Sequence, residues 1–236
     1  MLLHVVLLYG NMREGKYMCG FVGFTGRLED KREYLNRMMD RIIHRGPDMA
    51  GEYLDDDVAL GFRRLSIIDL SEAGRQPMCS EDGNTVIVFN GEIYNFMELR
   101  RELEEKGHTF HTDTDTESLI HGYEEYGEEL VRHLRGMFAF VIWDKRRKLL
   151  YGARDFFGIK PFYYGKLKNG ELIFGSEIKS FLDHPEFEKK LNRAALRPYL
   201  TFQYSATEET FFAGVYKLPP AHFFVYQNVN MHTERY

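Results

Sequence analysis

The chain has 236 residues, of which 44% are hydrophobic and 28% charged, the composition of an ordinary globular protein that buries a substantial core. Its formal net charge of −5, with no run of basic residues, argues against a nucleic-acid-binding surface. The two cysteines, Cys19 and Cys79, are too few for a disulfide framework and favour a reducing, cytoplasmic location.

Residues 1–18 carry no recognisable targeting signal. The apolar run at residues 2–9 is not preceded by Lys or Arg, as a secretory signal peptide requires. It is also much shorter than the roughly 18 apolar residues that a transmembrane helix needs, so no membrane association is expected. We interpret residues 1–18 as an N-terminal extension, either a propeptide or sequence upstream of a misassigned start, and residues 19–236 as one domain.

The rest of the chain contains helical and strand patterns in separate groups. In chain order, the patterns predict a helix at 30–43, strands at 58–62 and 85–89, helices at 95–107 and 116–127, and strands at 137–143, 149–153, 162–165 and 172–175. Asn95 with Glu98 should form a capping box, Asn169-Gly170 favours a type I′ turn, and Ser176 should cap a short helix. Because the strands occur in runs, the sequence predicts an α+β fold of layered sheets rather than a βαβ succession.

Cys19 directly follows Met18, and this pair suggests a chemical role. Removal of an initiating Met18 would leave Cys19 as the first residue, with a thiol and a free α-amine on the same residue. An α-amine titrates near pH ~8 and a thiol near ~8.5, so the amine can accept the thiol proton close to neutrality. The alternative interpretation is a buried strand cysteine with no chemistry.

Several polar residues also allow two interpretations each. Asn90-Gly91 follows an apolar strand, where a side-chain amide and a backbone N–H can together form an oxyanion hole, or the pair can be a simple turn. Asp115 lies in a segment that can equally cap the following helix. Arg64, between apolar neighbours, either pairs with a carboxylate or is solvated.

The histidines do not show metal-binding spacing. His108 and His111 are the one close pair, and they lie on a predicted loop without further ligands, so we expect no metal site. The chain also lacks a serine nucleophile elbow and a glycine-rich phosphate loop.

Several blocks of the sequence, taken in order, form a recognisable set: residues 18–23, 44–48, 64–70, 90–95, 115–117, 154–161, 176–179 and 217–220. Together these blocks resemble one family, the class II glutamine amidotransferase domain of glutamine-hydrolysing asparagine synthetase. The resemblance implies the four-layer αββα sandwich of N-terminal-nucleophile hydrolases.

The resemblance also implies roles for individual residues. Cys19 would be the nucleophile and its α-amine the general base, and Asn90 with the Gly91 N–H would form the oxyanion hole. The substrate-binding residues would be Arg64 for the glutamine α-carboxylate, Glu92 and Asp115 for its α-amine, and Ile68.

The implied activity is hydrolysis of glutamine to glutamate and ammonia, without a cofactor in this domain. The ammonia would pass to a synthetase domain that uses ATP and Mg²⁺ to form asparagine from aspartate, and that domain is not present here. A homodimer is a further expectation. The alternative is a catalytically silent interaction or regulatory domain, because residues 1–18 block the amine of Cys19.

Overall fold

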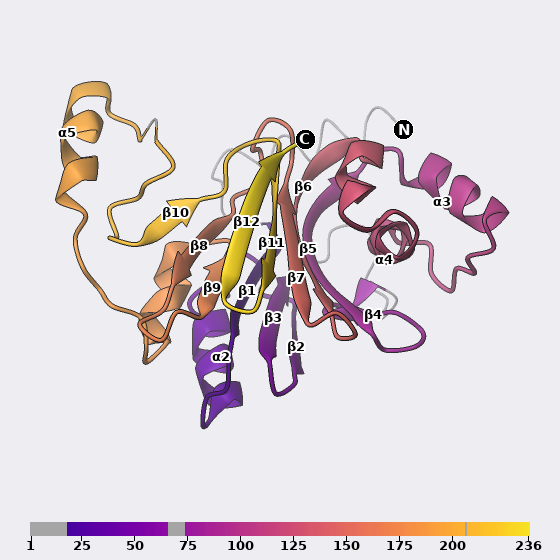
Figure 1. Ribbon diagram of the computed structural model, residues 1–236, viewed down its shortest axis with the longest axis horizontal. Coiled ribbons are helices and arrows are strands. Elements are labelled where there is room, and N and C mark those ends of the chain that lie inside the picture. Colours follow the sequence, from indigo (N-terminus) through magenta and orange to yellow (C-terminus); the bar gives the residue numbers. More distant parts are fainter. Residues whose placement is uncertain (1–17, 66–73, 206) are drawn as a thin grey trace.

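The computed structural model describes residues 18–65, 74–205 and 207–236, and its centre consists of two antiparallel sheets (Figure 1). Sheet A has the strand order β10 (Val215–Lys217), β8 (Tyr163–Lys166), β9 (Leu172–Gly175), β1 (Gly20–Thr25), β3 (Val58–Arg64) and β2 (Met49–Leu54). Sheet B has the order β12 (Asn230–Arg235), β11 (His222–Gln227), β7 (Leu149–Arg154), β6 (Gly136–Asp144), β5 (Thr85–Ile93) and β4 (Met78–Cys79). Every neighbouring pair is antiparallel.

Helices cover the outer face of each sheet. On sheet A these are α2 (Lys31–Asp40) and the 3-10 helix η4 (Ile178–Asp183). On sheet B, α4 (Asp115–Tyr126) and η3 (Gly127–His133) pack against the strands, and α3 (Phe96–Glu105) packs against α4. The helix α5 (Arg193–Phe202) projects from the side of the molecule (Figure 1). The predicted four-layer αββα sandwich is therefore confirmed.

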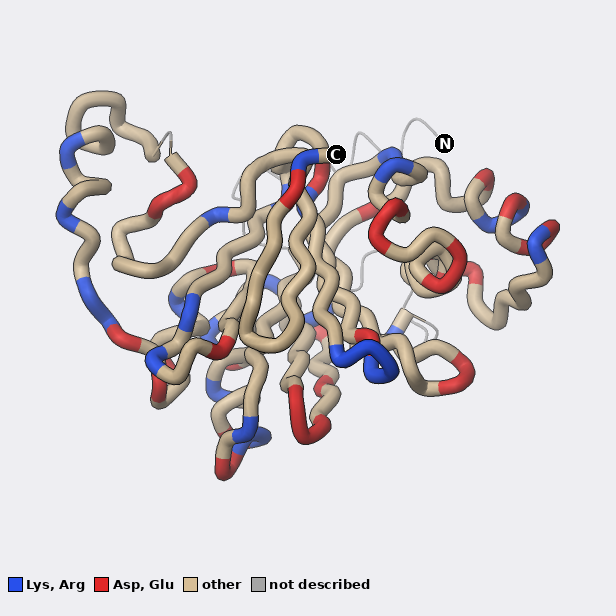
Figure 2. Tube along the Cα trace, viewed as in Figure 1, with Lys and Arg blue, Asp and Glu red and all other residues tan. Residues whose placement is uncertain are grey.

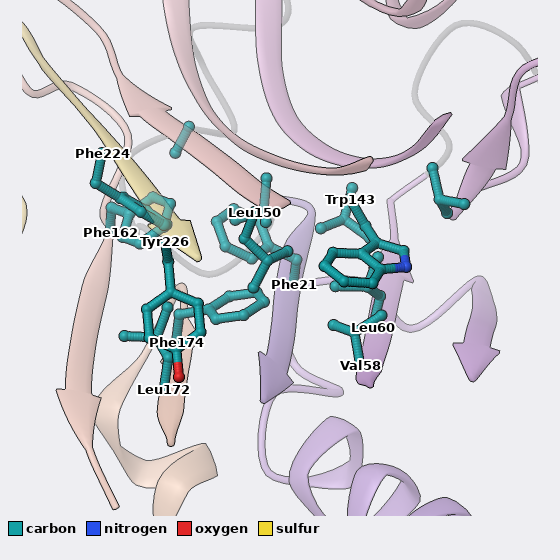
Figure 3. Packing of buried hydrophobic residues seen from close by; sticks show 14 of the residues in the cluster. Phe21, Val58, Leu60, Trp143, Leu150, Phe162, Leu172, Phe174, Phe224 and Tyr226 are labelled. Atoms are coloured by element: carbon teal, nitrogen blue, oxygen red, sulfur yellow. The ribbon is translucent and has the colours of Figure 1, made fainter. Parts of the chain in front are cut away.

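Three clusters of buried side chains fill the three spaces between the layers. In the central cluster, Phe21 and Leu60 of sheet A meet Trp143, Leu150 and Phe224 of sheet B (Figure 3). The two outer clusters lie between each sheet and its helices. Both faces of the central strands are thus buried, which explains why their sequences are unbroken apolar runs instead of alternating patterns.

The strands that the sequence predicted are all present, with small shifts at their ends. Their unbroken apolar composition was a strong signal because both faces are buried. Six strands and one helix had no prediction, namely β1, β2, β4, β10, β11, β12 and α5. Four of these strands, β2, β4, β10 and β12, lie at the edges of the sheets, where residues that face solvent weaken the pattern, whereas β1 and β11 lie inside the sheets.

Three local predictions were wrong. Asn95 does not cap α3 with its side chain, which instead donates to His133 O (2.9 Å) and accepts from Arg135 N (2.8 Å). Asn169 does not have the positive φ that a type I′ turn needs, and only the following Gly170 does (φ +87°). Ser176 does not cap η4, because its hydroxyl accepts the backbone N–H of Phe21 at 3.1 Å. In two cases a tertiary partner replaced the local one.

Charged residues of both signs are interspersed along the chain (Figure 2). In the part of the chain that the structure describes, no helix combines the length and apolar character needed to cross a membrane.

Candidate active site

Cys19 lies immediately before β1, a central strand of sheet A, and its side chain is partly buried. Its sulfur accepts the backbone N–H of Leu65 at 3.4 Å and lies 3.8 Å from the Leu65 carbonyl oxygen. Burial raises the pKa of the Cys19 thiol, although the Leu65 amide and the cations of Lys160 and Arg64 oppose that rise. The thiol is therefore protonated at neutral pH and needs a base in order to act as a nucleophile.

Arg45 packs against the backbone of the nucleophile. Its Nε donates to Cys19 O at 3.1 Å, and its Nη1 donates to Glu177 Oε1 at 2.9 Å. The guanidinium passes so close to Gly20 that a Cβ there would lie 2.9 Å from the Arg45 Cδ, so a side chain at this position would displace it. The third nitrogen, Nη2, is buried and has no hydrogen-bond partner among the described residues.

Arg64, at the end of β3, is 9% exposed. Its guanidinium lies beside Gly74, where a Cβ would come within 2.5 Å of Nη2, and its charge acts on the Cys19 thiol. The structure thus brings this predicted carboxylate-binding residue close to the nucleophile. Ile68, the other substrate-binding residue expected from this segment, lies outside the described residues.

Asn90 and Gly91 lie near the end of β5, in sheet B. Asn90 is 2% exposed, and its Nδ2 has no hydrogen-bond partner within the described ranges. On the same strand, the N–H of Phe89 donates to Gln76 Oε1 (2.6 Å) and that of Ile93 donates to Asp115 Oδ2 (3.0 Å). Because N–H groups alternate along a strand, the Gly91 N–H points to the same edge between these two. The strand therefore offers two donors, as an oxyanion hole requires.

Asp115 is the first residue of α4, and Thr114 caps that helix by accepting the N–H of Glu117. The hydrogen bond to Ile93 fixes the Asp115 carboxylate beside the end of β5. Burial raises the pKa of Asp115, and the negative charge of Glu92 adds to this rise. Two carboxylates close together in a partly buried place would both be stabilised by a bound ammonium group.

The loop after β7 is held by two charged residues, Arg154 and Asp155. Asp155 is fully buried, and its carboxylate accepts four backbone N–H groups, those of Phe138 (3.2 Å), Phe157 (3.1 Å), Ile159 (2.9 Å) and Lys160 (2.9 Å). Arg154 donates to three carbonyl oxygens, those of Gly158 (2.7 Å), Lys160 (2.8 Å) and Leu218 (2.6 Å). These bonds give the loop one conformation and fix the backbone of Lys160.

Lys160 is a candidate site residue that the sequence did not single out. Its side chain is 6% exposed, and its Nζ lies 3.4 Å from the sulfur of Met18. Burial lowers its pKa, and the charges that act on it include Cys19, Arg45 and Glu92. The charge of Lys160 therefore interacts both with Cys19, beside sheet A, and with the carboxylate of Glu92, in sheet B. The sequence contained one indication of this residue: Lys160 is a lysine between Ile159 and Pro161, in an otherwise apolar segment.

Of the predicted residues that the structure describes, Cys19 and Arg64 lie together beside sheet A, and Asn90, Gly91, Glu92 and Asp115 lie at the end of β5 in sheet B. Two buried nitrogens there, Arg45 Nη2 and Asn90 Nδ2, have no hydrogen-bond partner among the described residues, and Lys160 Nζ contacts the sulfur of Met18. Unpaired buried donors are uncommon and costly unless a ligand supplies their acceptors. The one described group with metal-ligand proximity, on α4 and the loop before it, includes none of these residues.

The two helix-covered antiparallel sheets, with a cysteine directly before a central strand, define an N-terminal-nucleophile hydrolase fold. The glutamine phosphoribosylpyrophosphate amidotransferase from Bacillus subtilis, solved in complex with ADP and GMP, shares this fold, with a TM-score of 0.68 and 19% identity over 92% of this chain and 49% of that one. The chain belongs to the glutamine amidotransferase domain family, whose family model matches residues 18–236.

Two curated relatives show how this domain occurs in longer proteins. Over 208 residues the chain is 48% identical to asparagine synthetase [glutamine-hydrolyzing] 1 of Bacillus subtilis (strain 168), a match that covers 86% of this chain and 32% of that protein. It is 40% identical over 225 residues to amidase chry2 of Gibberella zeae, covering 88% of this chain and 32% of that protein. The chain spans about a third of the length of these relatives.

Proposed function

We propose that this domain hydrolyses glutamine to glutamate and ammonia, and that Cys19 is its nucleophile. The observation that carries the proposal is the pair of donors on β5, the unpaired Asn90 Nδ2 and the Gly91 N–H at the strand edge. An amide hydrolase needs two such donors for the oxygen that becomes negative in the tetrahedral intermediate. A purely structural asparagine would be expected to pair its buried amide.

The chemistry follows from one residue with two functional groups. The Cys19 α-amine takes the thiol proton, and the sulfur attacks the carboxamide carbon of glutamine. The oxyanion is received by Asn90 and Gly91, and ammonia leaves with the proton that the amine returns. Water then attacks the thioester with the same amine as base, which releases glutamate and restores the thiol.

The two ends of the substrate require opposite charges. Glutamine is a zwitterion, and we assign its α-carboxylate to Arg64 and its α-ammonium to Asp115 with Glu92. Two observations support this arrangement: the charge of Arg64 acts on the Cys19 thiol, and the Asp115 carboxylate accepts the N–H of Ile93. The assignment of Ile68 to the same pocket remains a proposal that rests on the family resemblance.

We further propose that the ammonia is used for asparagine synthesis by a synthetase part. That part would need ATP and Mg²⁺, whereas the glutaminase reaction needs no cofactor. The identity to the Bacillus synthetase supports this acceptor, while the relative named as an amidase indicates that the same domain also occurs with other chemistry. The two unpaired thiols favour the reducing cytoplasm as the place of reaction, and a homodimer is part of the same proposal.

A second candidate, a silent domain, is supported by one contact region. Met18 N donates to Arg45 O at 3.1 Å and the Met18 sulfur contacts Lys160, so Met18 is held in place directly before Cys19. While Met18 is attached, the Cys19 nitrogen is an amide and cannot act as a base. We therefore propose that the domain becomes active only when residues 1–18 are absent.

The direct test is covalent labelling together with an assay. A diazoketone analogue of glutamine should label Cys19 in a chain that begins at this residue, and Cys19→Ala should abolish both the label and ammonia release. Cys79→Ser is the matched control, because Cys79 is exposed on β4 and should be dispensable. Labelling mainly at Cys79, or full activity in Cys19→Ala, would refute the assignment.

A further inference from the structure

Three potential metal ligands meet on the outer helical layer of sheet B, in residues that the glutaminase proposal does not use. His108 follows α3, and His121 and Glu124 lie three residues apart on α4. The loop between the two helices folds back so that His108 lies beside α4, in the region where α3 and α4 lie side by side (Figure 1). Acidic residues recur on both of these helices (Figure 2).

The ligand atoms already have nearly the separations of a metal site. The Nδ1 of His121 lies 3.0 Å from Glu124 Oε2, and the Nδ1 of His108 lies 3.8 Å from the same oxygen. One atom from each residue falls within 4.8 Å of the others. Around a tetrahedral zinc with bonds of about 2.0–2.1 Å, neighbouring ligand atoms are about 3.4 Å apart. Small side-chain rotations would therefore complete the geometry.

The opposite nitrogen of each imidazole faces a second carboxylate. His108 Nε2 lies 3.4 Å from Glu125 Oε2, and His121 Nε2 lies 3.8 Å from Glu117 Oε1. Glu117 is itself held by the backbone N–H groups of His111 and Thr112, both at 2.7 Å. Metal-binding histidines usually have such a carboxylate behind them, because it fixes the ring and makes the ligating nitrogen more basic.

We propose that His108, His121 and Glu124 form a binding site for a divalent transition metal of the zinc type. Two imidazoles and one carboxylate suit such an ion and leave a fourth position for water. The side chain of Glu124 is 31% exposed, which gives a hydrated ion access to the three ligands.

The bound ion would connect the loop of residues 106–114 to α4. That helix begins with Asp115, so the ion would stabilise the segment that positions this carboxylate. The proposal does not depend on glutaminase activity, because it concerns residues that do not contact the nucleophile region through any interaction described above.

The test measures Zn²⁺ binding to the full chain by calorimetry after treatment with EDTA. We expect one ion per chain at this site and a rise in Tm of about 5–10 °C at 100-fold excess over the Kd. A Cys19→Ala/Cys79→Ser chain contains no thiol, so a metal ion that it binds has no cysteine ligand. Co²⁺ added to this chain should give d–d absorption bands without sulfur charge-transfer bands.

Single substitutions compare the loss of Zn²⁺ affinity at two proposed ligands with the loss at a nearby histidine that is not a proposed ligand. His108→Ala and Glu124→Gln change partly exposed side chains, so the fold should persist, and each should weaken binding at least 10-fold. His111→Ala is the control, because His111 lies on the same loop but is 63% exposed and pairs with Glu81. Wild-type affinity in His108→Ala and Glu124→Gln, no binding by the wild type, or an equal loss in His111→Ala would overturn the proposal.

Discussion

The ammonium of Lys160 lies 3.4 Å from the sulfur of Met18, directly beside the residue that carries the nucleophile. The Lys160 backbone is fixed by Asp155 and Arg154, and its side chain is buried. The Lys160 charge also acts on the Cys19 side chain, so we expect it to act on the α-amine of Cys19 that forms when Met18 is absent. A nearby like charge disfavours the protonated amine, and the same cation favours the thiolate. We therefore expect Lys160 to keep the base of the proposed reaction neutral.

Lys160→Met should therefore shift the pH dependence of glutamine hydrolysis. Without the cation, the pKa of the α-amine rises, so the acid limb of kcat/KM should move to higher pH by about one unit, with a fall of roughly 10-fold at neutral pH. Lys160→Arg retains the charge and should keep the limb in place. An unshifted limb in Lys160→Met would leave Lys160 with only a packing role.

Asn90→Ala should lower kcat by about 10²–10³ with little loss of stability. Its Nδ2 makes no hydrogen bond within the described residues, so the folded protein loses no bond when the amide is removed. Asn95→Ala is the matched control, because its side chain makes two hydrogen bonds. The control should lose about 0.5–1.5 kcal/mol of unfolding free energy per bond and keep its kcat. The opposite pattern would exclude the oxyanion role.

Arg64→Ala and Asp115→Asn should each raise the KM for glutamine. A charged hydrogen bond contributes about 1.5–3 kcal/mol, which corresponds to a rise of roughly 10- to 150-fold. Arg63→Ala is the control, since Arg63 precedes Arg64 on β3 but its guanidinium contacts Met39 O and Asp40 on the helical side. Unchanged KM values in both site variants would mean that these residues are a structural arginine and a helix-terminal carboxylate.

A chain that begins at Met18 and loses that methionine should hydrolyse glutamine, whereas the 236-residue chain should not. General base assistance contributes about 10²–10⁴ in rate, and the amide nitrogen of Cys19 in the longer chain cannot provide it. The measurement is ammonia release from both chains, with the first residue of each read by mass spectrometry. Equal rates from an unprocessed chain would rule out the α-amine mechanism.

His184 should make the protein less stable below neutral pH. It is buried against Phe24, with ring centroids 4.5 Å apart, and burial lowers its pKa to about 4. An unfolded histidine binds its proton near pH ~6.5, so between these values the unfolded state holds more protons than the folded state. The stabilisation is complete above pH ~6.5 and is lost as the pH falls towards 4, by up to about 3 kcal/mol.

Urea unfolding at several pH values measures this dependence. His184→Leu should remove it, because the substituted side chain does not titrate. His232→Ala, an exposed histidine on β12, should retain the wild-type dependence. A pH dependence that is the same in His184→Leu and in the wild type would show that other groups cause it.

The local sequence was sufficient for six strands of the two sheets, namely β3, β5, β6, β7, β8 and β9. Strands with two buried faces are continuous apolar runs, and this pattern needs no knowledge of partners. The sequence also suggested the chemistry that we propose for Cys19, since a thiol and an α-amine can occur together on that one residue. The ordered blocks around Asn90, Asp115 and Arg154 then indicated the family.

Only the tertiary structure decided which polar groups have partners. Local rules assigned Asn95 and Ser176 to helix caps. Instead, their side chains accept the backbone N–H groups of Arg135 and Phe21, which lie 40 and 155 positions away in the sequence. The position of Lys160 beside Met18 depends on a buried carboxylate that orders a loop, and the approach of His108 to His121 depends on how that loop folds back on α4. Such contacts join residues distant in sequence, so periodicity and propensity, which report only the burial and conformation of neighbouring residues, do not contain them.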